Sequence, residues 1–339
     1  MKIQILCTLG PASLSAEIIE QLDQAGVDLF RLNLSHTRLE TLEPCIKLVQ
    51  SASAKPLCLD LEGAQVRCGT MAPGVALRKG DPVRLTAAPV QGTAGELTLW
   101  PRSVFGALRV GSLVTIDFDG ARVCVQETGE DHAEGVVVDG GAVRSDKGVV
   151  VDPAPALPAL TDKDRAAIAL GTAHHIRHVA LSFASSAADV ELVRSLAPGA
   201  QVIAKIESSA GVRNMDGIID RSDAVLIDRG DLSREVPLEY VPFYQKAIAR
   251  RANRWSRQVF VATNLLESMV TNRNPTIAEA NDVANTLLDG VHGLVLAAET
   301  AIGRDPVGIV RMVSRMIHAF EWSNFATLLD RDQPEAIAS

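Results

Sequence analysis

Short apolar runs recur along the chain, separated by longer segments with helical patterning. Eight of these runs are rich in Val, Ile, Leu and Ala, and they cover residues 3–9, 29–34, 56–61, 178–183, 202–207, 224–228, 258–264 and 293–299. Each is too apolar to keep one face in water, which is typical of parallel strands that helices cover on both faces. We therefore predict a β-strand at each run.

The segments between the runs carry helix start and stop signals. Thr276 and Glu279 have the spacing of a capping box, and Gly290 is placed to end the helix that they begin. Thr161 with Asp164 begins another helix. Eight strands with helical spacers predict an α/β fold, a (β/α)8 TIM barrel. An open, doubly wound sheet is the alternative that the pattern leaves open.

One connection breaks this rhythm. Between Arg67 and Leu160 the sequence loses its helical periodicity and becomes rich in Gly, Val and turn residues. Short antiparallel strands are indicated at 112–120, 121–127, 133–141 and 147–151, with turns at Asp119 and Gly120 and at Gly140 and Gly141. We predict a small β-barrel-like lid domain over residues 70–158. It is inserted after the third strand of a catalytic barrel built from residues 1–69 and 159–339.

Composition narrows the classes of function. Apolar residues make up 47% of the 339 residues, which excludes an intrinsically disordered chain. The 41 acidic residues outnumber the 33 basic ones, which argues against a nucleic-acid partner or an anionic membrane. The five cysteines form no C-x-x-C pair, and no signal peptide or membrane-spanning run is evident. We therefore expect a cytoplasmic protein with reduced thiols.

Polar residues gather where the predicted barrel strands end. TIM barrels carry their reactive groups at the carboxyl ends of their strands. Here those positions hold Arg31, Asn33, Ser35, Asp60, Lys205, Glu207, Arg229, Asp231, Thr263 and Glu299. Arg31, Lys205 and Arg229 are suited to bind a phosphate or a carboxylate. Glu207 and Asp231, from neighbouring strand ends, can hold one Mg²⁺. A purely structural layer of salt bridges is the alternative.

Several motifs of the chain together resemble those of the pyruvate kinase family. In order, from residue 2 to about residue 320, they are KIQILCTLGPAS, DLFRLNLSHT, LTDKD, VIAKIESSAGVRNMDGI, RGDL, VATNLLESM, NPTIAEANDVAN and ETAIG. The most specific combination is K-I-E followed by G-V-R-N and then R-G-D-L. The resemblance implies a barrel with a β lid after its third strand. It also implies phosphoryl transfer between phosphoenolpyruvate and a nucleoside diphosphate.

The resemblance assigns charged residues to the reaction. It implies that Lys205 lies beside the transferring phosphoryl group and stabilises its charge. Arg31 matches a phosphate-binding arginine, whose planar guanidinium suits oxyanions. Glu207 and Asp231 match the ligands of a divalent cation, Mg²⁺ or Mn²⁺, that also holds the oxoacid.

The resemblance also assigns the groups that bind the substrate, which is phosphoenolpyruvate, pyruvate or a close analogue. The backbone amides of Gly230 and Asp231 and the hydroxyl of Thr263 match the groups that hold its carboxylate. Thr263 also lies where the family protonates the enolate. Phe183 joins the implied substrate-binding residues.

Two further sets are implied in the same way. The ligands of a monovalent cation such as K⁺ would be Asn33, Ser35 and Asp60. The contacts to the nucleotide, ADP or ATP, would be Arg67, His36, Lys147 and Asp119, the last two from the lid. We also expect a homo-oligomer.

The sequence departs from the family pattern on the nucleotide and potassium side. The third-strand motif reads approximately D-T-K-G-P-E-I-R in the family and DLEGAQVR at residues 60–67 here. Glu62 therefore reverses a charge, and Gln65 replaces a glutamate that is linked to potassium dependence. Asp228 stands where the family has an alanine before R-G-D. Only a short polar tail follows Phe320, so we expect the family's C-terminal regulatory domain to be absent.

Three functions are compatible with these residues. The leading hypothesis is a Mg²⁺-dependent phosphotransferase of pyruvate kinase type. A metal-dependent lyase or aldolase acting on a 2-oxoacid would reuse the same enolate-stabilising site, and Glu62 and Asp228 favour it. A non-catalytic binding protein derived from a kinase is the third hypothesis. The intact Lys205 and Glu207 oppose that last possibility, because an idle site needs no buried charges.

Overall fold

The structure is a computed structural model that describes residues 2–117 and 120–322. It divides into two compact units, one formed by residues up to 62 with residues from 160 onward, and the other by residues 63–159. The sequence pattern placed the first boundary a few residues later, after residue 69. The difference arises because strand β4 (Arg67–Cys68) pairs with β7 (Glu96–Trp100) inside the second unit.

Eight parallel strands form a closed barrel in the first unit. They are β1 (Gln4–Leu9), β2 (Leu29–Asn33), β3 (Leu57–Asp60), β13 (His178–Leu181), β14 (Gln201–Lys205), β15 (Ala224–Asp228), β16 (Gln258–Ala262) and β17 (Gly293–Leu296). Strand β17 pairs with β1 and closes the barrel. Each apolar run of the sequence coincides with one of these strands to within a few residues. The predicted (β/α)8 barrel is therefore confirmed, and the open sheet is excluded.

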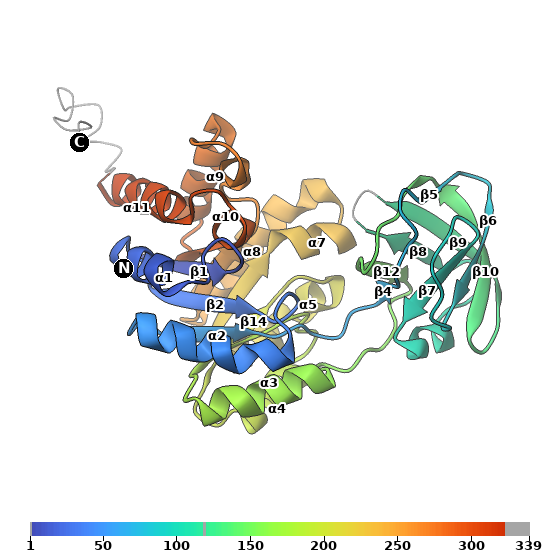
Figure 1. Ribbon diagram of the computed structural model, residues 1–339, viewed down its shortest axis with the longest axis horizontal. Helices are drawn as coiled ribbons and strands as arrows, with labels where there is room; N and C mark the ends of the chain where they lie inside the picture. The colour runs from blue at the N-terminus through green and yellow to red at the C-terminus, as the bar shows by residue number, and fades with distance from the viewer. Residues whose placement is uncertain (1, 118–119, 323–339) are drawn as a thin grey trace. The chain divides into compact units, whose positions relative to one another are not determined.

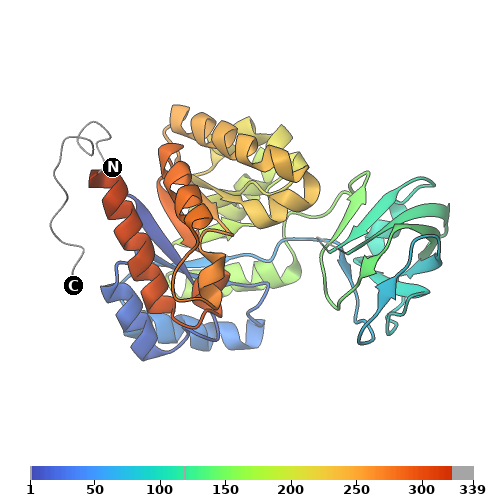
Figure 2. The same cartoon turned by 90° about the horizontal axis from the view of Figure 1, so that it is seen from above.

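Helices surround the barrel strands (Figures 1 and 2). They are α1 (Ala16–Gln24), α2 (Leu39–Ala52), α3 (Asp162–Ala173), α4 (Ala187–Leu196), α5 (Ser209–Arg213), α6 (Met215–Arg221), α7 (Arg229–Glu235), α8 (Val241–Arg254), α9 (Ile277–Leu288), α10 (Ala298–Ala301) and α11 (Pro306–Trp322). Short 3-10 turns lie at Leu238–Tyr240 and Glu267–Val270. Among the helices described, none combines the length and the apolar character needed to cross a membrane.

The predicted helix signals are formed. Thr161 and Asp164 make a capping box at the start of α3, and Thr276 and Glu279 make one at the start of α9. Gly290 follows α9 with a φ of +77°, a left-handed conformation that glycine adopts without the steric penalty of a side chain. These local signals fix where the helices begin and end, and hence where the strand ends meet.

The second unit is a small β domain. Its main sheet has the order β12-β8-β9-β10-β6-β7-β4, and a bridge between Arg67 and Gly148 brings β4 back beside β12, so the sheet nearly closes into a barrel. Besides β4 and β7, its strands are β6 (Pro82–Thr86), β8 (Leu113–Ile116), β9 (Ala121–Thr128), β10 (His132–Asp139) and β12 (Val149–Asp152). The prediction of an inserted β-barrel-like domain is confirmed.

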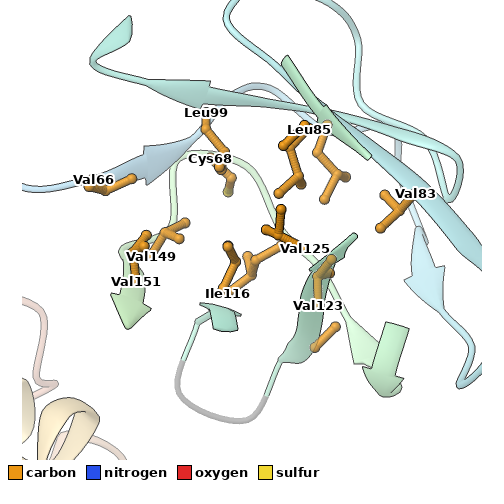
Figure 3. Close-up of a cluster of buried hydrophobic side chains, with 14 of the residues drawn as sticks. Val66, Cys68, Val83, Leu85, Leu99, Ile116, Val123, Val125, Val149 and Val151 are labelled. Atoms are coloured by element: carbon orange, nitrogen blue, oxygen red, sulfur yellow. The ribbon is translucent and has the colours of Figure 1, made fainter. Parts of the chain in front are cut away.

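The interior of this domain is aliphatic. Side chains such as Leu85, Val123 and Val125 point toward one another and are buried (Figure 3). A 3-10 turn at Arg102–Gly106 and a two-stranded sheet of β5 (Ala76–Leu77) with β11 (Gly141–Ala142) complete it. The expected hairpin at Gly140 and Gly141 is not formed, because β12 pairs with β8 and not with β10. The domain thus has a core of its own.

Two layers of inward-facing side chains fill the end of the catalytic barrel. The lower layer is apolar and takes residues from all eight strands, among them Leu6, Cys58 and Ile203. Side chains two residues apart on a strand share one face. Six of the apolar residues are followed, two residues later in the sequence, by a buried polar residue. These polar residues are Thr8, Arg31, Asp60, Ser182, Lys205 and Asp228. The apolar layer is therefore the floor of a polar layer at the carboxyl ends of the strands.

Candidate active site

Lys205 lies at the centre of a buried network of charges. Three carboxylate oxygens surround its Nζ atom: Glu207 Oε2 at 3.1 Å, Asp60 Oδ1 at 3.5 Å and Asp228 Oδ2 at 3.8 Å. The Nζ atom also donates a hydrogen bond to Ser182 Oγ at 3.0 Å. Burial by itself lowers the pKa of Lys205, but the surrounding carboxylates outweigh burial and raise that pKa. The lysine is therefore a fixed positive charge.

Arg31 extends the network through Asp60. Its Nε donates a hydrogen bond to Thr8 Oγ1 at 2.8 Å, and its Nη1 lies 3.0 Å from Asp60 Oδ2. Asp60 faces a cation at each of its oxygens, Arg31 at one and Lys205 at the other. Such pairing offsets the cost of burying a carboxylate that is only 1% exposed. Arg31 thus fixes Asp60, and Asp60 helps to fix Lys205.

Glu207, Asp228 and Asp231 form a group of three carboxylates. One oxygen of each lies within 4.8 Å of the others. Burial raises the pKa of Glu207 to about 8; the charges of Asp231 and Asp228 add to this rise and that of Lys205 opposes it. Oxygen ligands gathered in this way suit a hard divalent cation such as Mg²⁺ or Mn²⁺. The sequence predicts Glu207 and Asp231 as ligands, and the structure places Asp228 beside them.

Carboxylate groups outnumber cations in this cluster. Two buried cations face four carboxylates; the cations are Arg31 and Lys205, and the carboxylates are Asp60, Glu207, Asp228 and Asp231. A third cation, Arg234, pairs with Asp231 Oδ1 at 3.2 Å from a more exposed position. Carboxylates still outnumber cations when Arg234 is counted, and this crowding adds to the rise in the pKa of Glu207. A bound divalent cation would favour the ionised form of Glu207 and offset the charges of its neighbours, so the residues present fit a divalent metal.

Two residues that follow barrel strands have backbone conformations that are rare outside glycine. Phe183 has a φ of +53°, and Thr263, which is β-branched, has a φ of +70°. The Phe183 N–H donates to Glu207 Oε1 at 2.8 Å, and the Thr263 hydroxyl donates to Asp228 Oδ1 at 2.5 Å. Both turns therefore direct a hydrogen-bond donor at the carboxylate group.

Three donors converge on Asp228 Oδ1: the Thr263 hydroxyl at 2.5 Å, the Gly230 N–H at 3.2 Å and the Asp231 N–H at 3.4 Å. We call these three donors the amide cradle. A Cβ atom on Gly230 would lie 3.3 Å from Thr263 Cγ2 and 3.4 Å from Asp228 Oδ1, so the absent side chain leaves room for the contact. Asp228 is the N-cap of α7.

The Arg229 guanidinium is held by groups of the protein itself. Its guanidinium donates to the carbonyl oxygens of Thr263 and Asn264 and pairs with Asp282 at 2.7 Å. Thr263 and Asn264 both have positive φ values. The expectation that Arg229 binds a phosphate or carboxylate of a ligand is therefore corrected: it braces the turn that carries Thr263.

Replacing Arg229 by methionine is expected to lower the free energy of unfolding by about 3 kcal/mol, because Asp282 and the strained turn lose a partly buried charged partner. Urea unfolding monitored by circular dichroism measures this change. Arg251→Met is the matched control. Its pair with Asp216 is exposed, so the expected loss is less than about 1 kcal/mol. Equal losses for the two variants would contradict the bracing role.

The predicted ligands of a monovalent cation come together only in part. Asn33 and Asp60 are paired in register on β2 and β3. The Asn33 Oδ1 atom accepts a hydrogen bond from the Ser35 N–H at 2.9 Å. Both oxygens of Asp60 face the cations Arg31 and Lys205. The side-chain oxygens of Asn33 and Asp60 are thus engaged within the protein.

The residues assigned to the nucleotide fall in different places. Arg67 and Lys147 lie side by side in the second unit, where Cys68 N–H donates to Lys147 O at 2.9 Å. The Arg67 Nη1 atom donates to the backbone oxygen of Asp146 at 3.1 Å. His36 is exposed on the turn after β2 in the first unit. The fourth, Asp119, lies outside the described residues.

The charge reversal at Glu62 is compensated. Its Oε2 atom lies 2.8 Å from Lys163 Nζ, and its N–H donates to Asp164 Oδ1 at 2.7 Å. Lys163 also donates to the carbonyl oxygen of Leu34. Glu62 therefore does not add an unpaired negative charge at the barrel mouth, which removes one of the two features that favoured a lyase.

A closed (β/α)8 barrel with a charged mouth and an inserted β domain defines a TIM-barrel enzyme. The family model of the pyruvate kinase barrel domain matches residues 1–310. A pyruvate kinase of Methylorubrum extorquens is 36% identical in an alignment 352 residues long. The alignment covers 100% of this chain and 73% of the relative.

Two further relatives give similar figures. A pyruvate kinase of Corynebacterium efficiens is 38% identical, with 94% of this chain and 70% of the relative covered. One of Mycobacterium tuberculosis is 35% identical, with 95% and 71% covered. The chain belongs to the pyruvate kinase family, a family of phosphotransferases.

Proposed function

We propose that this chain transfers a phosphoryl group between phosphoenolpyruvate and a nucleoside diphosphate. The observation that carries the proposal is the excess of carboxylates around the fixed charge of Lys205. Glu207 and Asp231 would hold Mg²⁺ or Mn²⁺. When bound, the cation supplies a Lewis acid that draws charge from the oxygens of the substrate.

The chemistry of this transfer depends on positioning and on charge stabilisation. The bond between phosphorus and the enol oxygen breaks, and a bond forms between phosphorus and a terminal oxygen of the diphosphate. The enolate that remains takes up a proton at its methylene carbon and becomes pyruvate. Lys205 would stabilise the negative charge of the transferring group. Arg31 would be a second cation that binds the phosphate. We assign delivery of the proton to Thr263, through a water molecule.

Binding of the two substrates would involve different residues. The amide cradle would hold the carboxylate of phosphoenolpyruvate, and Phe183, which orients Glu207, would border the same site. Arg67 and Lys147 would contribute positive charge toward the nucleotide, together with His36. Asp119 would be a further contact to the nucleotide.

A coupled assay tests the proposed function. Purified protein is incubated with phosphoenolpyruvate, ADP and Mg²⁺, and pyruvate is followed through lactate dehydrogenase and NADH. Formation of pyruvate that requires both ADP and Mg²⁺ is expected. Consumption of pyruvate that requires an aldehyde, with no need for nucleotide, would instead support the lyase.

Potassium is expected to have little effect on the rate. Asp60, a predicted ligand of the monovalent cation, already pairs with Arg31 and Lys205, and a third positive charge beside them would be repelled. The same assay with potassium chloride and with tetramethylammonium chloride at equal ionic strength measures the effect. We expect the two rates to agree within about two-fold, because salts at equal ionic strength screen the charges of the protein to a similar extent. Strict dependence on potassium would show that Asn33, Ser35 and Asp60 rearrange to bind it.

A further inference from the structure

Asp228 places a carboxylate of the protein inside the amide cradle. All three cradle donors point at one of its oxygens, and the shortest of these hydrogen bonds, from Thr263, is 2.5 Å long. Backbone amides at a helix start and a nearby hydroxyl bind carboxylate oxygens by charge-assisted hydrogen bonds. The cradle is therefore a carboxylate-binding site, and the structure shows it filled by the chain's own side chain.

The contacts of the two Asp228 oxygens differ. Oδ1 accepts from the three cradle donors, whereas Oδ2 is 3.8 Å from Lys205 Nζ, outside hydrogen-bond distance. Glu207, by comparison, accepts one backbone N–H at Oε1, and its Oε2 lies 3.1 Å from the lysine. Asp228 is thus held mainly by the cradle, and Glu207 by the lysine and one amide.

A substrate carboxylate and the Asp228 carboxylate need the same three donors. The space beside Gly230 is narrow, since an added Cβ atom would already lie within 3.5 Å of Thr263 and of Asp228 Oδ1. The two carboxylates are also both negative, so that they repel each other at this distance. Binding of one therefore excludes the other from the cradle.

We propose that Asp228 is an internal competitor for the substrate carboxylate, and so a residue that determines specificity. A 2-oxoacid, or its enol phosphate, must displace Asp228 from the cradle before its own carboxylate can bind. The proposal rests on the proposed function for the identity of the ligand. Its consequence is that this chain binds carboxylate ligands more weakly than the same site would without the aspartate.

Oxalate binding tests the proposal without the need for phosphoryl transfer. Oxalate carries carboxylates and resembles the enolate of pyruvate, and its Kd is measured by calorimetry with Mg²⁺ present. Asp228→Ala empties the cradle, and the Kd for oxalate is expected to fall at least about ten-fold, the change that one lost competing charge-assisted contact of about 1.4 kcal/mol would give. Asp228→Gly should give the same result, and glycine is a good N-cap residue that protects the start of α7.

Two further variants separate occupancy of the cradle from charge. Asp228→Asn removes the negative charge but keeps an oxygen that accepts from the same donors, so the Kd is expected to change much less than in Asp228→Ala. Equal tightening in both variants would overturn the proposal, because repulsion alone would explain it. Asp216→Ala removes an exposed carboxylate and should leave the Kd unchanged.

Titration with Mn²⁺ alone separates competition from metal binding. If Asp228 competes for the cradle, Asp228→Ala binds Mn²⁺ about as well as the parent chain does. A loss of Mn²⁺ affinity together with a loss of oxalate affinity would identify Asp228 as a metal ligand and overturn the proposal. A negative kinase assay with tighter oxalate binding in Asp228→Ala would reject the proposed function alone. A positive assay with unchanged oxalate binding would reject the competitor alone.

Discussion

Replacing Lys205 by methionine is expected to lower kcat for phosphoryl transfer by about 10³-fold, the order of effect seen when a preorganised charge or donor at a transition state is lost. Methionine has a similar length but cannot offset the charge of the transferring group. Glu207, Asp60 and Asp228 surround the lysine, and Arg31, the second buried cation of this network, is held by Thr8 and Asp60. The coupled assay at saturating phosphoenolpyruvate and ADP measures the loss.

The same substitution should also destabilise the barrel. Without the lysine, the carboxylates around it lose their shared cation, and the free energy of unfolding is expected to fall by about 3 kcal/mol. Lys47→Met removes a lysine from an exposed pair with Glu43 on α2, and should change neither rate nor stability appreciably. A Lys205→Met protein that kept a tenth or more of the activity would contradict the role of this cation.

Replacing Glu207 by glutamine is expected to abolish the stabilisation that a divalent cation gives to the fold. In the parent chain, Mg²⁺ at 100 times its Kd should raise the free energy of unfolding by about 2.7 kcal/mol, and the melting temperature by several degrees. Glutamine keeps the volume and can still accept the hydrogen bond from Phe183 N–H, but it lacks the charge. Thermal unfolding with Mg²⁺ and with EDTA measures the difference.

Glu235→Gln is the matched control for that experiment. Glu235 is a half-buried carboxylate that accepts a hydrogen bond from Ser209 N–H at 2.7 Å, but it lies outside the group of three carboxylates. Its Mg²⁺-dependent rise in melting temperature should be preserved. If Glu207→Gln also kept the full rise, the assignment of Glu207 as a metal ligand would be wrong.

The barrel could be predicted because its strands are buried on both faces. Every run of Val, Ile, Leu and Ala in the first unit became a strand, and both capping boxes formed where the sequence placed them. The boundary of the inserted domain was harder to predict, because β4 is only two residues long and its partner β7 is distant in sequence. A short strand with a distant partner leaves little pattern of apolar residues in the sequence from which it could be predicted.

The charged layer of the site was also predictable in part. Lys205 is the last residue of an apolar strand and Glu207 follows it, and burial of a lysine there requires carboxylate partners. Asp228 was recognised only as a departure, because its role depends on where its side chain points. That direction is set by the strained turn at Thr263, and Arg229 holds this turn through Asp282, which lies far along the chain. No local pattern encodes such contacts.

Phosphorus NMR of phosphoenolpyruvate and ADP with the purified protein tests the central claim most directly. With Mg²⁺ present, we expect the phosphoenolpyruvate resonance to disappear as the γ-phosphate resonance of ATP grows by the same amount. After EDTA is added, we expect no transfer. Loss of phosphoenolpyruvate to inorganic phosphate, or no change beyond that seen with Lys205→Met, would contradict it.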